Sequence, residues 1–286
     1  MNNQPIGVFD SGIGGLTVAH AIKKILPNED IIYFGDTEHL PYGEKSKKAI
    51  KNYSRKITQF LLHKKCKVII IACNSASSLA YKSVKNTAKK IPVFNVINPI
   101  INHIVKQYSE YNIGVIGTKA TIQSNIYETE IKTLCKSAKV SSLTTPLLAP
   151  MIEEGFINDD ISQTVIANYL ANKKLANIEH LILACTHYPL IRHKINEYYK
   201  GKVNVIDSAN IVAKHIAEQL EKNDILSNSK KNKHQLPKDV IQSLNDYLKD
   251  ERIMEHNFRT LINPFTDMLK SAILRESMPH TLLYVP

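Results

Sequence analysis

The sequence has few cysteines, and their spacing excludes two kinds of stabilising site. Only four cysteines occur among 286 residues, and no two of them form a CxxC pair. At about 150 residues per domain, a chain of this length forms one large domain or two medium ones, and it buries a sizeable core without covalent staples. A disulfide-built mini-fold is therefore excluded, and zinc-finger spacing is absent.

The sequence also lacks long hydrophobic runs and a secretory leader. Its longest apolar runs, such as residues 68–73, stop far short of the roughly 18 to 20 residues that a membrane-spanning helix needs. The first five residues lead directly into a strand-like segment, without the basic, hydrophobic and cleavage regions of a signal peptide. The mean hydropathy of −0.19 is typical of a globular protein. We expect a cytoplasmic protein with no membrane partner.

Arginine is scarce despite a strongly basic composition. The net charge is +11, yet only five of the 37 basic residues are arginine, the side chain best suited to bidentate phosphate contacts. The densest basic stretch, residues 45–56, has the spacing of one solvated helix face. No nucleic-acid-binding motif accompanies the charge, so we do not expect nucleic acid to be the main partner.

Short apolar runs alternate with longer stretches of helical periodicity, which is typical of an α/β fold. Most of the short runs are apolar throughout, as in strands buried on both faces of a parallel sheet. The predicted strands are 6–9, 30–34, 67–72, 92–96, 112–116, 140–143, 180–184 and 203–206. The predicted helices are 15–26, 46–63, 76–90, 99–108, 121–137, 161–172, 189–199 and 209–221.

An internal repeat divides the chain into two similar halves. Three segments of the first half recur in the same order in the second, at offsets of 107, 112 and 110 residues: 6–11 as 113–118, 69–75 as 181–187, and 93–97 as 203–206. We therefore predict two similar α/β domains with mainly parallel sheets, related by a pseudo-twofold, with the active site in the cleft between them. The first domain comprises residues 1–97 plus 208–286, and the second comprises 98–207.

The chain after residue 222 differs in composition from the two halves. Residues 223–235 are polar and lysine-rich, which predicts an exposed linker. The segments 237–247 and 265–274 have a helical pattern, so we predict a helical C-terminal segment. No functional motif occurs there.

Polar clusters follow four predicted strands, where ligands bind in open parallel sheets. They occupy residues 10–15, 41–43, 73–75 and 185–187. Cys73 and Cys185 hold equivalent positions in the two halves, so a twofold relation places them on opposite sides of one cleft. That is the arrangement of two opposed acid/base groups.

A thiol suits acid/base chemistry because its pKa of about 8.5 falls toward neutrality beside a helix N-terminus. Both Cys73 and Cys185 precede predicted helices, so we expect both to be tuned in this way. Two such groups on opposite faces of a stereocentre remove a proton from one face and return one to the other. Asp10 and His187 are placed to orient or tune the thiols.

Several alternatives compete with this interpretation. Cys66 and Cys135 follow the ordinary pattern of buried small hydrophobes. A zinc site would use ligands of accepted types, namely Cys73, Cys185, His187 and Asp10. The hydroxyl and amide neighbours of the two cysteines favour a small anionic ligand instead. A Cys/His nucleophile pair would leave the second cysteine unexplained.

The glycine-rich loop after the first strand does not match a nucleotide-binding motif. A GxGxxG pattern from Gly12 would need glycine where the chain has Thr17, and no P-loop occurs. The loop is either a tight strand-to-helix turn or a place where backbone amides and Ser11 hold a carboxylate. We predict neither a cofactor nor a metal.

The four motifs together resemble a known family. DSGIGGLTV at 10–18, PYGEKS at 41–46, ACNSAS at 72–77 and ACTHYP at 184–189 are similar to those of the cofactor-independent aspartate/glutamate racemase superfamily, and specifically of the bacterial glutamate racemases. The resemblance runs in order from about residue 6 to 220. It implies an isomerase that interconverts L- and D-glutamate without pyridoxal phosphate or metal and supplies D-glutamate for peptidoglycan.

The resemblance also implies roles for individual residues. Cys73 would be the base for D-glutamate and Cys185 the base for L-glutamate, each acting as the acid in the opposite direction, with Asp10 and His187 assisting. The implied substrate-binding residues are Asp10, Ser11, Pro41, Tyr42, Gly43, Asn74, Ser75, Thr118, Glu153, Thr186 and His187. The alternative for Glu153 is an exposed carboxylate on a helix, without a role in the site.

Other functions remain open at this point. A racemase of aspartate or hydantoins is the nearest alternative, and a non-enzymatic amino-acid-binding protein is another. The expected partner is a small-molecule substrate, and a homodimer is an open alternative. The family usually closes its first domain with a short β-rich terminus, whereas this chain continues with the helical-looking segment described above.

Overall fold

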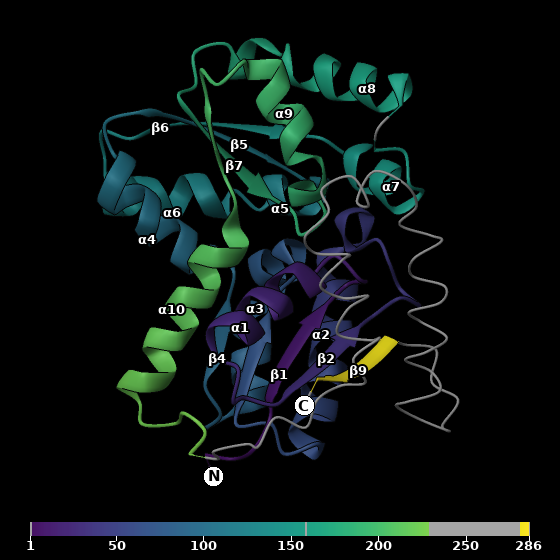
Figure 1. The fold of residues 1–286 in the computed structure, drawn as a ribbon, viewed down its shortest axis with the longest axis vertical. Helices are drawn as coiled ribbons and strands as arrows, with labels where there is room; N and C mark the ends of the chain where they lie inside the picture. The colour runs from purple at the N-terminus through teal and green to yellow at the C-terminus, as the bar shows by residue number, and fades with distance from the viewer. Residues whose placement is uncertain (1, 158, 229–280, 286) are drawn as a thin grey trace.

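The fold contains two separate β-sheets, each flanked by helices (Figure 1). The computed structural model describes residues 2–157, 159–228 and 281–285. The strands are β1 (Ile6–Asp10), β2 (Ile31–Gly35), β3 (Val68–Ile71), β4 (Val93–Asn95), β5 (Asn112–Gly117), β6 (Lys139–Thr144), β7 (His180–Ala184), β8 (Asn204–Ile206) and β9 (Thr281–Val285).

Helices connect the strands throughout the described chain. The α-helices are α1 (Leu16–Ile25), α2 (Lys47–His63), α3 (Asn74–Ala88), α4 (Ile97–Tyr108), α5 (Lys119–Gln123), α6 (Ile126–Leu134), α7 (Leu148–Glu153), α8 (Asp160–Leu170), α9 (Arg192–Tyr199) and α10 (Ser208–Lys222). The 3-10 helices are η1 (Tyr42–Glu44), η2 (Lys173–Leu175) and η3 (Tyr188–Ile191). All eight predicted strands are present, and the α/β fold class is confirmed.

The two sheets have the same topology. The first has the order β4-β3-β1-β2-β9, and the second has the order β6-β5-β7-β8. Read from the other edge, the second is β8-β7-β5-β6, which matches β4-β3-β1-β2 strand for strand. All pairs within these two four-strand sets are parallel. The repeat therefore corresponds to two similar α/β units, while the predicted domain boundaries by residue number stay a prediction.

The central strands are mostly apolar because helices cover both of their faces. Every residue of β1, β3 and β7 is buried. In the first sheet, Ile69 and Ile71 pack with residues of α2 and α3, whereas Val68 and Ile70 pack with residues of α1 and α10. Burial on both faces excludes the polar-apolar alternation of a half-exposed sheet.

Three elements differ from the sequence prediction. The predicted helix 121–137 is two helices, α5 and α6, because Asn125 between them has a left-handed backbone with φ 59°, a conformation that asparagine tolerates better than most residues. Helix α7 was not predicted, and the predicted helix 189–199 begins as the 3-10 helix η3.

The edge strand β9 was not predicted either. It pairs antiparallel with β2, with Ile31 opposite Val285 and Gly35 opposite Thr281. It thus adds a fifth strand to the first sheet, next to β2 (Figure 1). The predicted helices 237–247 and 265–274, and the predicted linker beyond residue 228, lie outside the described residues.

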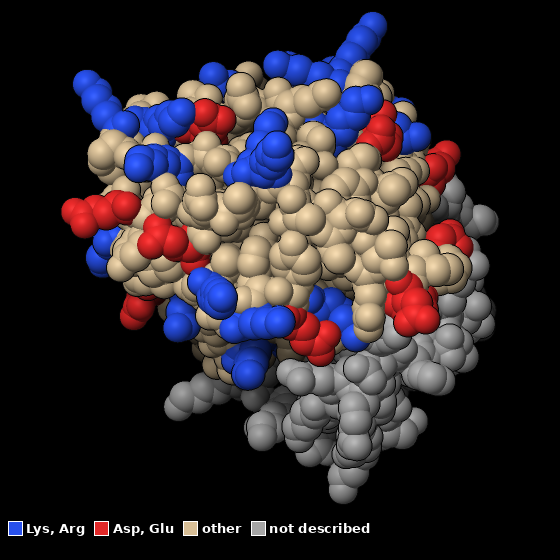
Figure 2. Space-filling view, turned by 90° about the horizontal axis from the view of Figure 1, so that it is seen from above, with Lys and Arg blue, Asp and Glu red and all other residues tan. Residues whose placement is uncertain are grey.

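Charged side chains of both signs lie on the face shown in Figure 2. On the face shown in Figure 2, lysine and arginine side chains are spread in separate groups with acidic side chains between them. Among the described residues of this face they form no continuous basic track of the kind that follows a nucleic-acid backbone. Within the described residues, no helix is both long enough and apolar enough to cross a membrane.

Candidate active site

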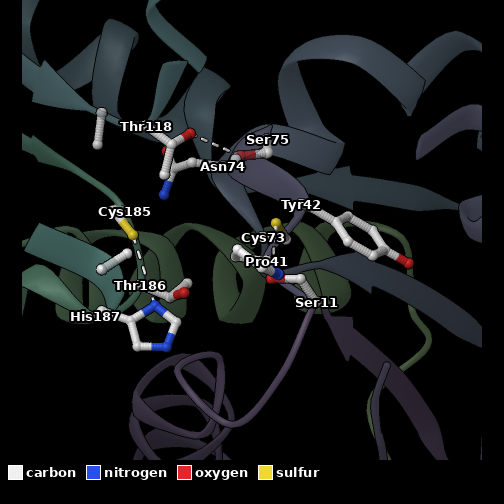
Figure 3. Close-up of a pocket in the computed structure, with 13 residues that line it drawn as sticks. Ser11, Pro41, Tyr42, Cys73, Asn74, Ser75, Thr118, Cys185, Thr186 and His187 are labelled. Carbon is white, nitrogen blue, oxygen red and sulfur yellow. Dashed lines mark hydrogen bonds between the residues drawn. The ribbon is translucent and has the colours of Figure 1, made fainter. Parts of the chain in front are cut away.

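A cavity lies between the carboxyl ends of the strands of both sheets (Figure 3). About 300 Å³ of space outside the protein atoms lies between its lining residues, counting the part that is open to solvent. Its lining residues are Ser11, Pro41, Tyr42, Gly43, Cys73, Asn74, Ser75, Thr118, Ala149, Ala184, Cys185, Thr186 and His187. The predicted site residues Asp10 and Glu153 lie behind this lining, and Ala149 and Ala184 are lining residues that the sequence did not single out.

Cys73 sits at the N-terminus of helix α3. The backbone N–H of Ala76 donates to its sulfur at 3.5 Å, and the thiol donates to Ser11 Oγ at 3.6 Å. Burial, followed by the negative charge of Asp10, raises the pKa of Cys73 to about 12, although the Ala76 N–H and Ser11 act in the opposite direction. The expectation of a lowered pKa is therefore wrong for Cys73, because loss of hydration outweighs the effect of the helix N-terminus.

Cys185 lies on the other side of the cavity, with a histidine beside it (Figure 3). Its sulfur is 3.6 Å from His187 Nδ1, and His187 Nε2 is 2.5 Å from Glu153 Oε1. Burial lowers the pKa of His187, but the contacts with Cys185 and Glu153 outweigh it and raise this pKa well above its ordinary value. The two cysteines thus have different neighbours: a carboxylate near Cys73 and a histidine beside Cys185.

Asp10 organises the glycine-rich loop. Its Oδ2 accepts hydrogen bonds from the N–H groups of Gly12 and Gly15, at 3.2 and 3.1 Å, and its Oδ1 accepts one from Thr186 across the cleft at 3.4 Å. A Cβ at Gly15 would lie 2.5 Å from Asp10 Cβ, so the close turn requires glycine. These two loop amides therefore bind a carboxylate of the chain itself, which favours the alternative of a tight strand-to-helix turn.

A cluster of hydroxyls forms another wall of the cavity. Ser75 Oγ is 2.9 Å from Thr118 Oγ1, and Thr121 Oγ1 lies 3.3 and 3.1 Å from these two oxygens. Thr121 is buried behind the lining, and the sequence did not indicate it. The loop with Gly43 packs directly against this wall, because a Cβ there would lie 2.7 Å from Thr118 Cβ.

Two further side chains of the first half shape the cavity. The hydroxyl of Tyr42 donates a short hydrogen bond to the buried Asp36, which fixes the ring. The amide of Asn74 is 3% exposed. Its Oδ1 accepts a hydrogen bond from Tyr127 at 2.8 Å, and the sequence did not indicate Tyr127.

The zinc alternative finds no support in the part of the chain that the structure describes. There, no three histidine, cysteine or acidic side chains are grouped so that they could hold a metal ion. The cavity instead presents thiols, hydroxyls and an amide, which suit a small polar ligand with acceptor oxygens.

Comparisons with known proteins agree with the geometry. The family model described as Asp/Glu/Hydantoin racemase matches residues 6–216. A glutamate racemase of Chlorobaculum tepidum is 42% identical over 228 residues, which cover 80% of this chain and 84% of the relative. The crystal structure of Francisella tularensis glutamate racemase in complex with D-glutamate has a TM-score of 0.75 and 41% identity, covering 80% of this chain and 86% of that one. Bacillus anthracis glutamate racemase RacE1 has a TM-score of 0.76 and 35% identity, with the same coverage.

These matches define the class of the protein, which is that of the racemases, a group of isomerases. The chain belongs to the Asp/Glu/Hydantoin racemase family. The resemblance to bacterial glutamate racemases, predicted from four motifs, is confirmed by relatives of about 40% identity over most of the chain.

Proposed function

We propose that this chain interconverts L- and D-glutamate by proton transfer at the α-carbon between two cysteines, without a cofactor. Cys185 removes the α-proton of L-glutamate while Cys73 delivers a proton to the opposite face, and the roles reverse for D-glutamate. The observation that carries this proposal is the pair of thiols at equivalent strand ends, on opposite sides of one cavity (Figure 3).

The difficult step is forming a carbanion beside a carboxylate without an electron sink. Hydrogen-bond donors that face the developing charge lower this barrier, and they act more strongly where water is excluded. Ser75 and Thr186 supply such donors, and Asn74 adds a donor that already binds the substrate before any chemistry; each of the three is nine-tenths buried or more. We assign them to the substrate carboxylates, together with Ser11 and Thr118.

The proposed substrate and role follow from the relatives. The Francisella tularensis relative was crystallised with D-glutamate. We propose that this chain binds the same ligand and that its reaction supplies D-glutamate for peptidoglycan.

A substrate panel tests the choice of amino acid. Purified protein without added cofactor is incubated with a single enantiomer of glutamate, of aspartate or of a hydantoin. The optical rotation of each solution is followed over time. We expect rotation to be lost with either enantiomer of glutamate and to persist with the other compounds. Loss of optical rotation with aspartate or a hydantoin, but not with glutamate, would contradict the proposal. Tight binding of glutamate without turnover would contradict it as well.

Replacing Glu153 by glutamine is expected to lower the pKa of His187. Glutamine keeps an oxygen for Nε2, but it removes the negative charge that helps to raise this pKa. His187 then loses its proton at a lower pH, and the basic limb of the kcat/KM profile moves to lower pH. An NMR titration of the His187 ring measures the shift.

Glu154 provides the matched control for that variant. It is the next carboxylate along the chain, and it is exposed. Glu154→Gln should leave the His187 titration where it is. An unchanged or higher pKa of His187 in Glu153→Gln would contradict the assignment of Glu153.

A further inference from the structure

The side-chain amide of Asn74 presents an unpaired donor to the cavity. Asn74 begins helix α3 and lines the cavity. Within the described residues its Nδ2 is buried and has no hydrogen-bond partner. Figure 3 shows this nitrogen directed toward the side of the cavity where Cys185 lies. A buried N–H group without an acceptor is costly, so this donor indicates a ligand with acceptor oxygens.

The orientation of that amide depends on Tyr127. An asparagine amide fits the same space in two orientations, which exchange its donor and its acceptor. Tyr127 O–H donates to Asn74 Oδ1 at 2.8 Å. Burial raises the pKa of Tyr127, so its hydroxyl keeps its proton and stays a donor. If the Asn74 amide were reversed, the buried proton of the Tyr127 hydroxyl would face the amide nitrogen Nδ2. Oδ1 would then face the cavity.

The bond also joins the two halves of the molecule. Tyr127 belongs to α6, which packs with the second sheet, whereas Asn74 follows β3 of the first. Tyr127 is 3% exposed and does not line the cavity, so it has no direct access to a ligand there.

We propose that Tyr127 is a positioning residue, which holds the Asn74 amide so that Nδ2 donates to a carboxylate of the substrate. The inference rests on the proposed function and adds a residue of the second unit to the recognition of the substrate. Because the Nδ2 contact forms with the bound substrate before any chemistry, its loss affects KM more than kcat.

A double-mutant cycle tests the positioning role. The variants are Tyr127→Phe, Asn74→Ala and the two combined, assayed for glutamate racemisation. We expect Tyr127→Phe to raise KM about tenfold, which corresponds to about 1.4 kcal/mol, and to change kcat less than about threefold. Because Tyr127 acts through Asn74, the double variant should be no worse than Asn74→Ala alone.

Two further variants serve as control and as second test. Tyr81→Phe removes a tyrosine hydroxyl that bonds Val93 O at 3.4 Å outside the cavity, and it should leave KM unchanged. Asn74→Asp keeps an acceptor for Tyr127 and replaces the donor by a negative charge. It has the same shape as the parent side chain, and it should raise KM more than Tyr127→Phe does. This test holds even if Tyr127→Phe does not fold.

The outcomes separate the inference from the proposed function. If the parent protein neither racemises nor binds glutamate, both the proposed function and the positioning role of Tyr127 are rejected. An active parent with an unchanged KM in Tyr127→Phe, with additive effects in the cycle, or with full affinity in Asn74→Asp rejects the positioning role alone.

Discussion

Replacing either Cys73 or Cys185 by serine is expected to abolish racemisation. Each thiol is assigned one face of the α-carbon, and a hydroxyl is a much weaker acid and base at neutral pH than a thiol. Loss of a positioned acid/base group costs about 10²- to 10⁴-fold in rate, and racemisation needs both groups. Loss of optical rotation, measured with each enantiomer, quantifies the effect.

The two variants should differ in what they retain. Cys73→Ser keeps Cys185, so it should still exchange the α-proton of L-glutamate with solvent, whereas Cys185→Ser should exchange that of D-glutamate. Cys135→Ser is the matched control, because Cys135 does not line the cavity, and it should remain fully active. Full turnover by either cavity variant, or exchange of the same enantiomer by both, would contradict the assignment.

Replacing Asp10 by alanine is expected to reduce kcat/KM at least about 100-fold and to lower the Tm. The fully buried carboxylate binds the N–H groups of Gly12 and Gly15, and leaving such groups unpaired costs about 1 to 3 kcal/mol each. The loop that carries Ser11 would lose its anchor, and the hydrogen bond from Thr186 across the cleft would be lost as well.

Asp10→Asn separates the charge of Asp10 from its structural role. The amide oxygen still accepts from Gly12 and Gly15, while the amide nitrogen faces Thr186, whose hydroxyl accepts instead. The Tm should therefore fall less than in Asp10→Ala. Because the charge of Asp10 raises the pKa of Cys73, this pKa should fall below its value of about 12. The pH dependence of Cys73 alkylation measures it, and an unchanged or higher pKa would contradict the coupling.

The strands could be predicted from the sequence because burial leaves a local pattern. β1, β3 and β7 are buried along their whole length, so their apolar runs have no polar interruption. Helix α7 left no such signal, since it has six residues and contains Pro150. The break before α6 depends on one left-handed residue, Asn125, within an otherwise helical pattern.

The residues around the cavity could be predicted where they directly follow strands. Residues that only contact the lining residues, without lining the cavity themselves, could not. Ser11, Cys73 and Cys185 stand directly after or just beyond predicted strands. Thr121 and Tyr127 contact the lining residues Ser75 and Asn74, which lie far away in the sequence. The raised pKa of Cys73 likewise depends on burial by both halves, which no local pattern records.

The most direct test of the account is the fate of the α-hydrogen when the parent protein racemises L-glutamate in D2O. The mechanism with two opposed thiols predicts that the D-glutamate formed carries deuterium at the α-carbon. It also predicts that the L-glutamate that remains early in the reaction keeps its protium there. The thiol that protonates the product has exchanged with solvent, and the other holds the proton it removed. D-glutamate that retains the original α-hydrogen would contradict the two-thiol mechanism, and the absence of racemisation would contradict the proposed function itself.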